Sequence, residues 1–404
     1  MLYEILAAVA ALLLAAALAA LLRVPARRLG VIDRRRQRAV PLCGGVAVVL
    51  TTCLVVAAWE WTGAPPLGDG IRELLVAGSA VAALGLVADV RRVKARFLVC
   101  GTAVAAACVV PYGELGLGGG VLAVGWIVFV ALGFRALDHA DALAGTVGVV
   151  TAFGVGVVAA AEVMDGPAVL LSVLAAALTG FLMHNWPPAR VGLGSCGSLF
   201  AGFLLASVAA LARTGYALAS SAEVLFALTA VAAADVLLVL LSRRLAGRPL
   251  LRGGPDHLAH RLRRLGLTPS GATVLVAAAA FSAVVVGVLV HIGWGTRTAT
   301  LWVAGVTLAV VLGLLRVPVY GLRRPTGVHR VGRQAVVRGT GAPGTGVRTG
   351  VHDIRRTAAG LATRPAGESY GSARPPRQSA PGWVPGGTAT RSSAGSARPG
   401  DGGQ

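Results

Sequence analysis

Two aspartates in the segment RALDHADALAG, Asp138 and Asp141, stand three residues apart, and His139 lies beside the first. Residues at this spacing share one face of a helix. Two carboxylates on one face repel each other unless a cation or a shared proton lies between them. The pair therefore favours a site that binds a metal ion or handles phosphate. The alternative is an exposed loop in which both acids are hydrated.

A third candidate carboxylate, Asp89, ends an apolar segment. A charged residue at membrane depth is costly, and this makes it a candidate for function. The alternative role is solvation of a helix end, or pairing with Arg91 or Arg92.

Two histidines, His257 and His260, have the same spacing within an arginine-rich stretch that includes Arg261. Imidazoles and guanidiniums together suit a pyrophosphate group. The alternative is an interfacial helix whose basic face contacts lipid headgroups. The glycine-rich stretch 191–202 runs into a helix, and backbone amides at such a helix start can hold anions. Glycine is also common where membrane helices touch, so this pattern is weak by itself.

The elements that position these residues are membrane helices. The chain has 404 residues, of which 55% are apolar and 13% charged, and its mean hydropathy is +0.74. A bilayer needs roughly 20 apolar residues per spanning helix. The fold class is therefore an all-α polytopic membrane protein. About eleven spans are predicted, although ten or twelve also fit, at 2–22, 44–61, 73–88, 97–112, 120–134, 146–161, 167–183, 198–214, 222–242, 271–292 and 299–317.

Arginine placement predicts the orientation of these spans. The loops 23–41, 89–96 and 243–269 are rich in arginine, whereas the alternate loops contain few basic residues. The positive-inside rule puts the arginine-rich loops in the cytoplasm, the N-terminus outside and the C-terminus inside. The first apolar run has no cleavage site after it, so we expect a retained helix.

The net charge of +20 comes mainly from arginines in the loops that determine membrane topology and from arginines in a C-terminal tail. Residues 1–321 form the predicted membrane domain, and residues 322–404 a disordered cytoplasmic tail rich in Arg, Gly, Pro and Ser. We therefore expect no nucleic-acid partner. The five cysteines form no CxxC pair, which predicts free thiols. The preference for arginine over lysine suggests a bacterial genome rich in GC.

Taken together, the polar loops resemble the polyprenyl-phosphate N-acetylhexosamine-1-phosphate transferases of glycosyltransferase family 4, over about residues 30–270. The family motifs are matched in chain order by Asp33, Pro41, Gly44, Gly45 and Ala47; by Gly85 and Asp89; by Asp141, Leu143 and Gly145; by Asn185, Pro188, Ala189, Gly194, Gly197 and Ser198; and by Asp235, Arg243, Arg244, Pro255, Asp256, His257, His260, Arg261 and Leu262.

The chain departs from the family pattern at several acidic positions. Ala88, Ala144 and Ser195 replace three aspartates, of which the one at 195 is a magnesium ligand in the family. Arg135 and Asp138 replace two asparagines. Since Asp138 and Asp141 keep the spacing of the family pair one helical turn earlier, we hypothesise that this moved pair binds Mg²⁺ with Asp89.

The resemblance implies transfer of a HexNAc-1-phosphate, GlcNAc-1-phosphate by the form of the last motif, from a UDP-sugar to polyprenyl phosphate. Such a reaction starts cell-wall, peptidoglycan or surface-glycan synthesis at the cytoplasmic face of the bacterial cell membrane. It implies catalytic roles for Asp89, Asp138 and Asp141, and Mg²⁺ ligation by these residues with Ser195. It implies substrate contacts by Asp33, Asn185, Ser195, His257, His260 and Arg261.

Two other interpretations remain open at this point. The three missing aspartates favour a non-catalytic family member that binds lipid phosphate or nucleotide-sugar as a scaffold or regulator. A transporter would carry ionisable residues near helix centres, where Asp235 is the candidate. The sequence also leaves a homodimer open.

Overall fold

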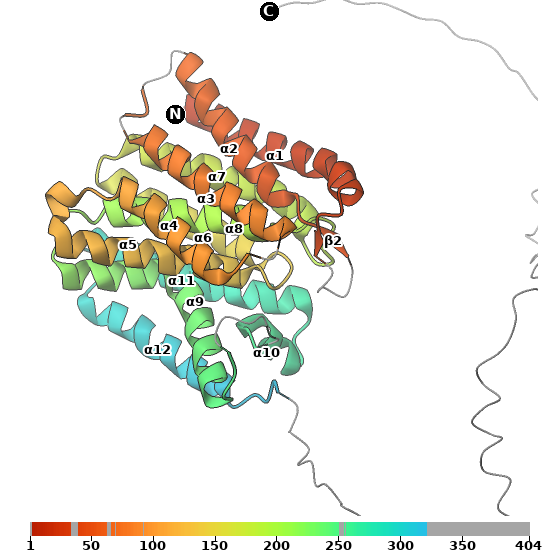
Figure 1. Cartoon of the computed structure of the whole chain (residues 1–404). Coiled ribbons are helices and arrows are strands. Elements are labelled where there is room, and N and C mark those ends of the chain that lie inside the picture. The colour runs from red at the N-terminus through yellow and green to blue at the C-terminus, as the bar shows by residue number, and fades with distance from the viewer. Residues whose placement is uncertain are drawn as a thin grey trace, which may run out of the picture. The chain divides into compact units, whose positions relative to one another are not determined.

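The computed structural model describes residues 2–33, 39–62, 66–68, 70–91, 93–249, 254 and 256–320, and the statements below concern these residues. The predicted tail 322–404 lies outside them, as do Arg92, Pro255 and several arginines of the first loop. The described residues form a helical bundle with one small sheet (Figure 1).

The elements follow one another in this order: α1 (Leu2–Arg28), β1 (Ile32–Asp33), β2 (Val40–Pro41), α2 (Gly44–Trp61), α3 (Ile71–Val90), α4 (Ala95–Val109), α5 (Tyr112–Leu137), α6 (Leu143–Ala161), α7 (Asp165–Asn185), α8 (Gly194–Leu211), α9 (Leu218–Leu245), α10 (Leu258–Arg264), α11 (Pro269–His291) and α12 (Arg297–Leu315). The strands pair antiparallel, with Ile32 opposite Pro41 and Asp33 opposite Val40.

Each predicted span corresponds to a helix, and ten of the described helices are long and apolar enough to cross a membrane. The exception is α4, which has 15 residues. At 1.5 Å per residue it reaches about 22 Å, short of the roughly 30 Å of a bilayer core. The protein is thus an all-α polytopic membrane protein.

Helix α8 lies at the centre of the bundle and is buried along most of its length. Glycines let two neighbouring helices approach its backbone. A Cβ on Gly85 of α3 would lie 2.4 Å from the carbonyl oxygen of Ser195, and one on Gly45 of α2 would lie 2.3 Å from the amide nitrogen of Gly197. Close backbone approach at small residues is typical of membrane helix packing. It fixes the first turn of α8 against the ends of α2 and α3.

Helix α1 presents a narrow buried stripe of alanines at every fourth position, Ala7, Ala11, Ala15 and Ala19. It packs on α7, where a Cβ on Gly180 would lie 2.1 Å from the carbonyl oxygen of Leu12. The Nε2 atom of His184 lies 3.1 Å from the carbonyl oxygen of Ala16. Large apolar side chains on the rest of α1 are exposed, as expected for a surface that faces lipid.

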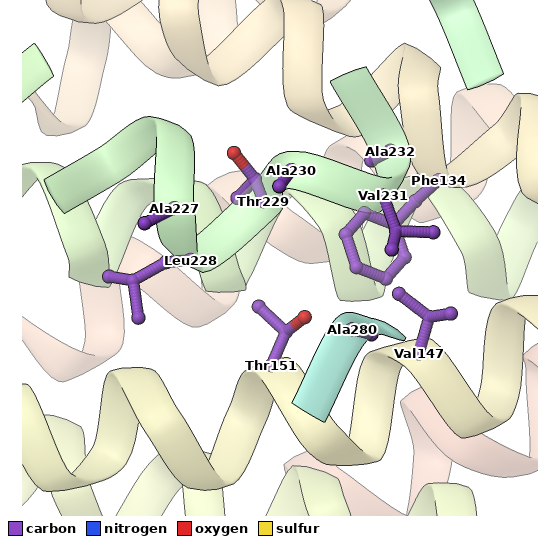
Figure 2. Close-up of a pocket in the computed structure, with 10 residues that line it drawn as sticks. All are labelled: Phe134, Val147, Thr151, Ala227, Leu228, Thr229, Ala230, Val231, Ala232 and Ala280. Carbon is purple, nitrogen blue, oxygen red and sulfur yellow. The ribbon is translucent and has the colours of Figure 1, made fainter. Parts of the chain in front are cut away.

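Helix α9 is interrupted at Thr229, whose φ and ψ are −124° and 17°. A pocket of about 200 Å³ lies beside the interruption, as Figure 2 shows. Apart from Thr151 and Thr229 its labelled lining is apolar, and its walls are too close together for a water molecule. This pocket does not suit a charged nucleotide, so the chemistry must be sought among the polar loops.

Candidate functional site

The first turn of α8 binds two of the predicted acids. Asp89 Oδ1 accepts a hydrogen bond of 2.9 Å from the amide of Ser195, and Asp89 Oδ2 accepts one of 3.1 Å from Cys196. Asp138 Oδ2 accepts one of 2.8 Å from the amide of Gly194. The first amides of a helix have no partner within the helix and carry partial positive charge. Both carboxylates therefore stabilise the start of α8.

The spacing predicts that Asp138 and Asp141 share a helix face, but in the structure they do not. They lie in the turn between α5 and α6, and Asp141 Oδ2 accepts a hydrogen bond of 3.0 Å from Ala189, away from the α8 amide that Asp138 contacts. The helical spacing fails because α5 ends at Leu137, with Asp138 as its C-cap residue, and α6 begins only at Leu143 after the left-handed Ala142.

Asn185, a predicted substrate contact, holds this turn in place. Its Oδ1 accepts a hydrogen bond of 2.8 Å from the amide of Ala142, and its Nδ2 donates one of 2.7 Å to the carbonyl of Val191. The side chain is 1% exposed. Its described contacts thus join the α5–α6 turn to the loop before α8. Asp33 lies half-buried on β1, and its substrate contact stays a prediction.

Ser195 is contacted by a cation of the chain itself. Arg135 Nε donates a hydrogen bond of 3.1 Å to Ser195 Oγ, and the positive charge of Arg135 also stabilises the carboxylate of Asp89. These are the positions where the family pattern has asparagine and aspartate. The guanidinium therefore supplies positive charge beside the residue that replaces a magnesium ligand.

The described donors do not fit Mg²⁺, which prefers carboxylate, carbonyl and water oxygens. Both oxygens of Asp89 accept amide hydrogen bonds, and Ala144 is 2% exposed in an apolar environment. In the described part of the chain, the group of His, Cys, Asp and Glu side chains close enough to share one ion is His139, Asp235 and His257. Ligation of Mg²⁺ by Asp89, Asp138, Asp141 and Ser195 stays a prediction that this donor set does not favour.

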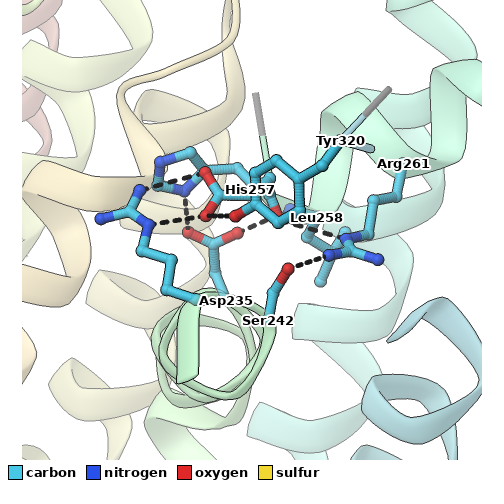
Figure 3. A network of polar contacts seen from close by, with 8 residues as sticks. Asp235, Ser242, His257, Leu258, Arg261 and Tyr320 are labelled. Atoms are coloured by element: carbon cyan, nitrogen blue, oxygen red, sulfur yellow. Dashed lines mark hydrogen bonds and ion pairs between the residues drawn. The ribbon is translucent and has the colours of Figure 1, made fainter. Parts of the chain in front are cut away.

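The histidines of two distant motifs meet in one cluster. The rings of His139 and His257 stack with centroids 4.3 Å apart, and the His260 ring is 4.9 Å from that of His139. His257 Nδ1 lies 2.8 Å from Asp235 Oδ2, and Asp235 Oδ1 accepts a hydrogen bond of 2.7 Å from the amide of Leu258. Figure 3 shows the side chain of Asp235, on α9, pointing towards His257 and Leu258.

Burial favours the neutral form of two of these imidazoles, His139 and His260. It lowers the pKa of His139 to about 3, and the neighbouring His257 and His260 act in the same direction, whereas Asp235 opposes them. Burial also lowers the pKa of His260, together with the charges of His257 and Arg263. His139 is therefore neutral at physiological pH.

Arg261 is buried among protein groups, and its contact with substrate stays a prediction. It is 1% exposed and donates hydrogen bonds to Ser242 Oγ at 2.5 Å and to the carbonyls of Leu314 and Val317 at 2.6 and 2.9 Å. It ties α10 to α9 through Ser242, as Figure 3 shows, and to the end of α12 through the two carbonyls. The alternative prediction for α10 is an interfacial helix whose basic face contacts lipid headgroups, but its Arg261 points into the protein.

A buried ion pair anchors the same region. Arg243 Nε and Nη2 donate to the two oxygens of Asp256 at 2.6 and 3.0 Å, and the Tyr320 hydroxyl donates to Asp256 Oδ2 at 2.8 Å. Burial disfavours the charged carboxylate, but the hydrogen bonds from Arg243 and Tyr320 outweigh it and hold the pKa of Asp256 below its usual value. The pair fixes the segment that leads into His257.

Comparison with known proteins agrees with these motifs. Residues 71–213 match the family described as Glycosyl transferase family 4. A Streptomyces coelicolor protein named "Putative glycosyltransferase" is 62% identical over 364 residues, which cover 89% of this chain and 88% of that protein. A decaprenyl-phosphate N-acetylglucosaminephosphotransferase of Mycolicibacterium smegmatis is 28% identical over 63% of this chain and 74% of its own length. A Bacillus subtilis protein named "Probable undecaprenyl-phosphate N-acetylglucosaminyl 1-phosphate transferase" is 28% identical over 38% of this chain and 43% of its own length.

Proposed function

Because this chain belongs to glycosyl transferase family 4, the family of the polyprenyl-phosphate HexNAc-1-phosphate transferases, we propose that it binds a UDP-HexNAc and a polyprenyl phosphate without Mg²⁺-dependent transfer. It is a multi-pass bacterial membrane protein. The ligand set follows from relatives named as decaprenyl- and undecaprenyl-phosphate transferases of N-acetylglucosamine phosphate. The proposed binding face is the end of the bundle at the start of α8, and the positive-inside rule predicts that this end faces the cytoplasm.

The contact between Arg135 and Ser195 is the observation that carries this proposal. A metal ion in this family neutralises the pyrophosphate and orients it. Here a fixed guanidinium stands beside a neutral hydroxyl, and Asp89 and Asp138 are hydrogen-bonded to the α8 amides. Arginine binds phosphate by charge-assisted hydrogen bonds. The arrangement thus suits the binding of a phosphate group more than its transfer with a metal ion.

The binding is tested with the purified full chain in detergent, by titration with UDP-GlcNAc and separately with decaprenyl phosphate. Arg135→Ala should weaken UDP-GlcNAc binding by about 10- to 100-fold, because a hydrogen bond to a charged group contributes roughly 1.5–3 kcal/mol. The control is Arg72→Ala. Arg72 lies at the other end of α3 in an exposed pair with Glu60, so its loss should leave binding unchanged. Equal binding by both variants would contradict the proposal.

The second candidate function is the transfer reaction itself, favoured by the retention of motif residues from several loops around the first turn of α8. In that reaction an oxygen of the polyprenyl phosphate attacks the sugar-linked phosphorus of the UDP-sugar, and the bond to UMP breaks. Membranes are incubated with radiolabelled UDP-GlcNAc, polyprenyl phosphate and Mg²⁺. We expect no lipid-linked sugar. If lipid-linked sugar forms with the natural chain and is absent from membranes that contain Asp89→Ala, the function is catalysis of the transfer and not binding alone.

A further inference from the structure

A compact group of three side chains lies at the junction of α5, α9 and α10. His139 comes from the turn after α5, Asp235 from α9, and His257 directly precedes α10. One potential ligand atom from each lies within 4.8 Å of the others. Asp235 is completely buried. The Mg²⁺ expectation does not involve this group, and the proposed ligand binding is argued from the start of α8. The substrate contacts expected for His257 and His260 stay predictions.

One nitrogen of His139 has no hydrogen-bond partner among the described residues, and this is Nε2, which is buried. Its other nitrogen, Nδ1, lies 2.8 Å from the carbonyl oxygen of Ala136. A carbonyl only accepts, so Nδ1 carries the proton and Nε2 presents its lone pair. Leaving a buried polar atom unpaired is destabilising. Metal-binding histidines usually show this arrangement, with one nitrogen free for the metal and the other donating to a carbonyl or carboxylate.

The other two side chains, Asp235 and His257, are already held close together. Asp235 Oδ2 and His257 Nδ1 are 2.8 Å apart, and the amide of Leu258 orients the second oxygen of Asp235. The His139 and His257 rings stack at an interplanar angle of 18°, with centroids 4.3 Å apart.

We propose that His139, Asp235 and His257 bind a divalent transition-metal ion of the Zn²⁺ class. Two imidazole nitrogens and one carboxylate oxygen suit Zn²⁺ or Fe²⁺, whereas Mg²⁺ takes oxygen ligands. With bonds of about 2.0–2.1 Å, ligand atoms of a tetrahedral Zn²⁺ are roughly 3.3 Å apart. The three atoms must therefore close from within 4.8 Å by small side-chain rotations. Three protein ligands leave a fourth position open, as in catalytic zinc sites.

The site is tested on the purified full chain without any UDP-sugar, so the result does not depend on the proposed ligand binding. The protein is treated with EDTA, exchanged into Co²⁺ or Zn²⁺, and its metal content is measured by mass spectrometry. We expect one ion per chain and a visible Co²⁺ spectrum without thiolate bands. His139→Gln and Asp235→Asn should each lose at least 10-fold in affinity.

The matched control is His260→Gln. Its ring is 4.9 Å from that of His139, but it is outside the group of three. This variant should bind Co²⁺ as tightly as the natural chain. Calorimetric titration of the natural chain is a second measurement that does not depend on the variants folding. Binding of Co²⁺ and Zn²⁺ weaker than roughly 10 µM in that titration, or unchanged binding by a folded His139→Gln variant, would overturn the proposal.

Discussion

Arg135 and Ser195 touch each other at two positions where the family pattern has asparagine and aspartate. In the family pattern the positive charge at this place comes from a bound Mg²⁺ ion, whereas here it comes from the guanidinium of Arg135. We predict that the double variant Arg135→Asn, Ser195→Asp gains an Mg²⁺-dependent rise in melting temperature, because it restores a carboxylate and removes the competing cation. The natural chain should show no such rise. An equal effect of Mg²⁺ on both proteins would contradict the interpretation.

Gly194 is required by its backbone and by its neighbour. Its φ is +73°, and a Cβ would lie 2.5 Å from Asp89 Oδ2. Gly194→Ala should lower the free energy of unfolding by more than the roughly 1–2 kcal/mol of left-handed backbone strain, and should also weaken UDP-GlcNAc binding. The control Gly215→Ala has a φ of +85° with no atom within 4 Å of the added Cβ, so it isolates the strain. Thermal unfolding and ligand titration compare the two.

Among single residues, the polar loops predict that Asp89, Asp138, Asp141 and Ser195 lie in one region. The structure brings Asp89 and Asp138 to the first turn of α8, which contains Ser195. The roles of these residues in binding and catalysis stay predictions. The hydrogen bonds of Asp89 and Asp138 to the amides of α8 were not predictable, since any exposed amide has the same sequence signature. The contact of His139 with His257 joins residues far apart in the chain, and no spacing rule reports such a pair. Burial of Arg261 was missed because arginine usually remains solvated.

At the scale of elements, Asp256 joins the start of α10 to Arg243 of α9. We predict that Asp256→Asn lowers the free energy of unfolding by about 3–5 kcal/mol, because the buried Arg243 loses its counter-charge. The comparison is Glu60→Gln, which breaks the exposed pair with Arg72 and should cost about 0–1 kcal/mol. Chemical unfolding in detergent measures both, and similar losses in the two variants would refute the assignment.

The pH dependence of the same pair has a definite sign. The pKa of Asp256 lies below its usual value because the hydrogen bonds from Arg243 and Tyr320 outweigh the effect of burial. The stabilisation is therefore complete above the ordinary carboxyl pKa and is lost as the pH falls through the lower, folded value. The natural chain should lose stability on acidification by more than Asp256→Asn does.

Helix positions were predictable because each span is a long apolar segment, but helix ends were less so. Helix α5 begins at Tyr112, earlier than predicted, since its first turn precedes a break at Gly116. Helix α4 falls short of a full span because Val110 and Pro111 separate it from α5. The turn at Ala142 was missed because alanine gives no sequence signal of left-handed backbone.

At the scale of the whole molecule, the predicted orientation puts the two ends of α11 on opposite sides of the membrane. Leu265 precedes α11 and Trp294 follows it, and both side chains are exposed. In a variant without the native cysteines, Trp294→Cys should react with an impermeant maleimide in intact cells, whereas Leu265→Cys should react only after permeabilisation. The reverse pattern would invert the orientation. The homodimer has no support in the described residues or the relatives, and we do not propose it.

The alanine stripe of α1 has a consequence for the order of membrane insertion. This helix leaves the ribosome first, but Gly180 and His184, which contact it, belong to α7. Until α7 is synthesised, α1 has α2 as its early neighbour and must expose part of its small-residue surface to lipid. The last turn of α7 also carries Asn185, which holds the α5–α6 turn. The polar end of the bundle can therefore assemble only after α7 is inserted, and the same helix covers the small-residue surface of α1 that was exposed to lipid.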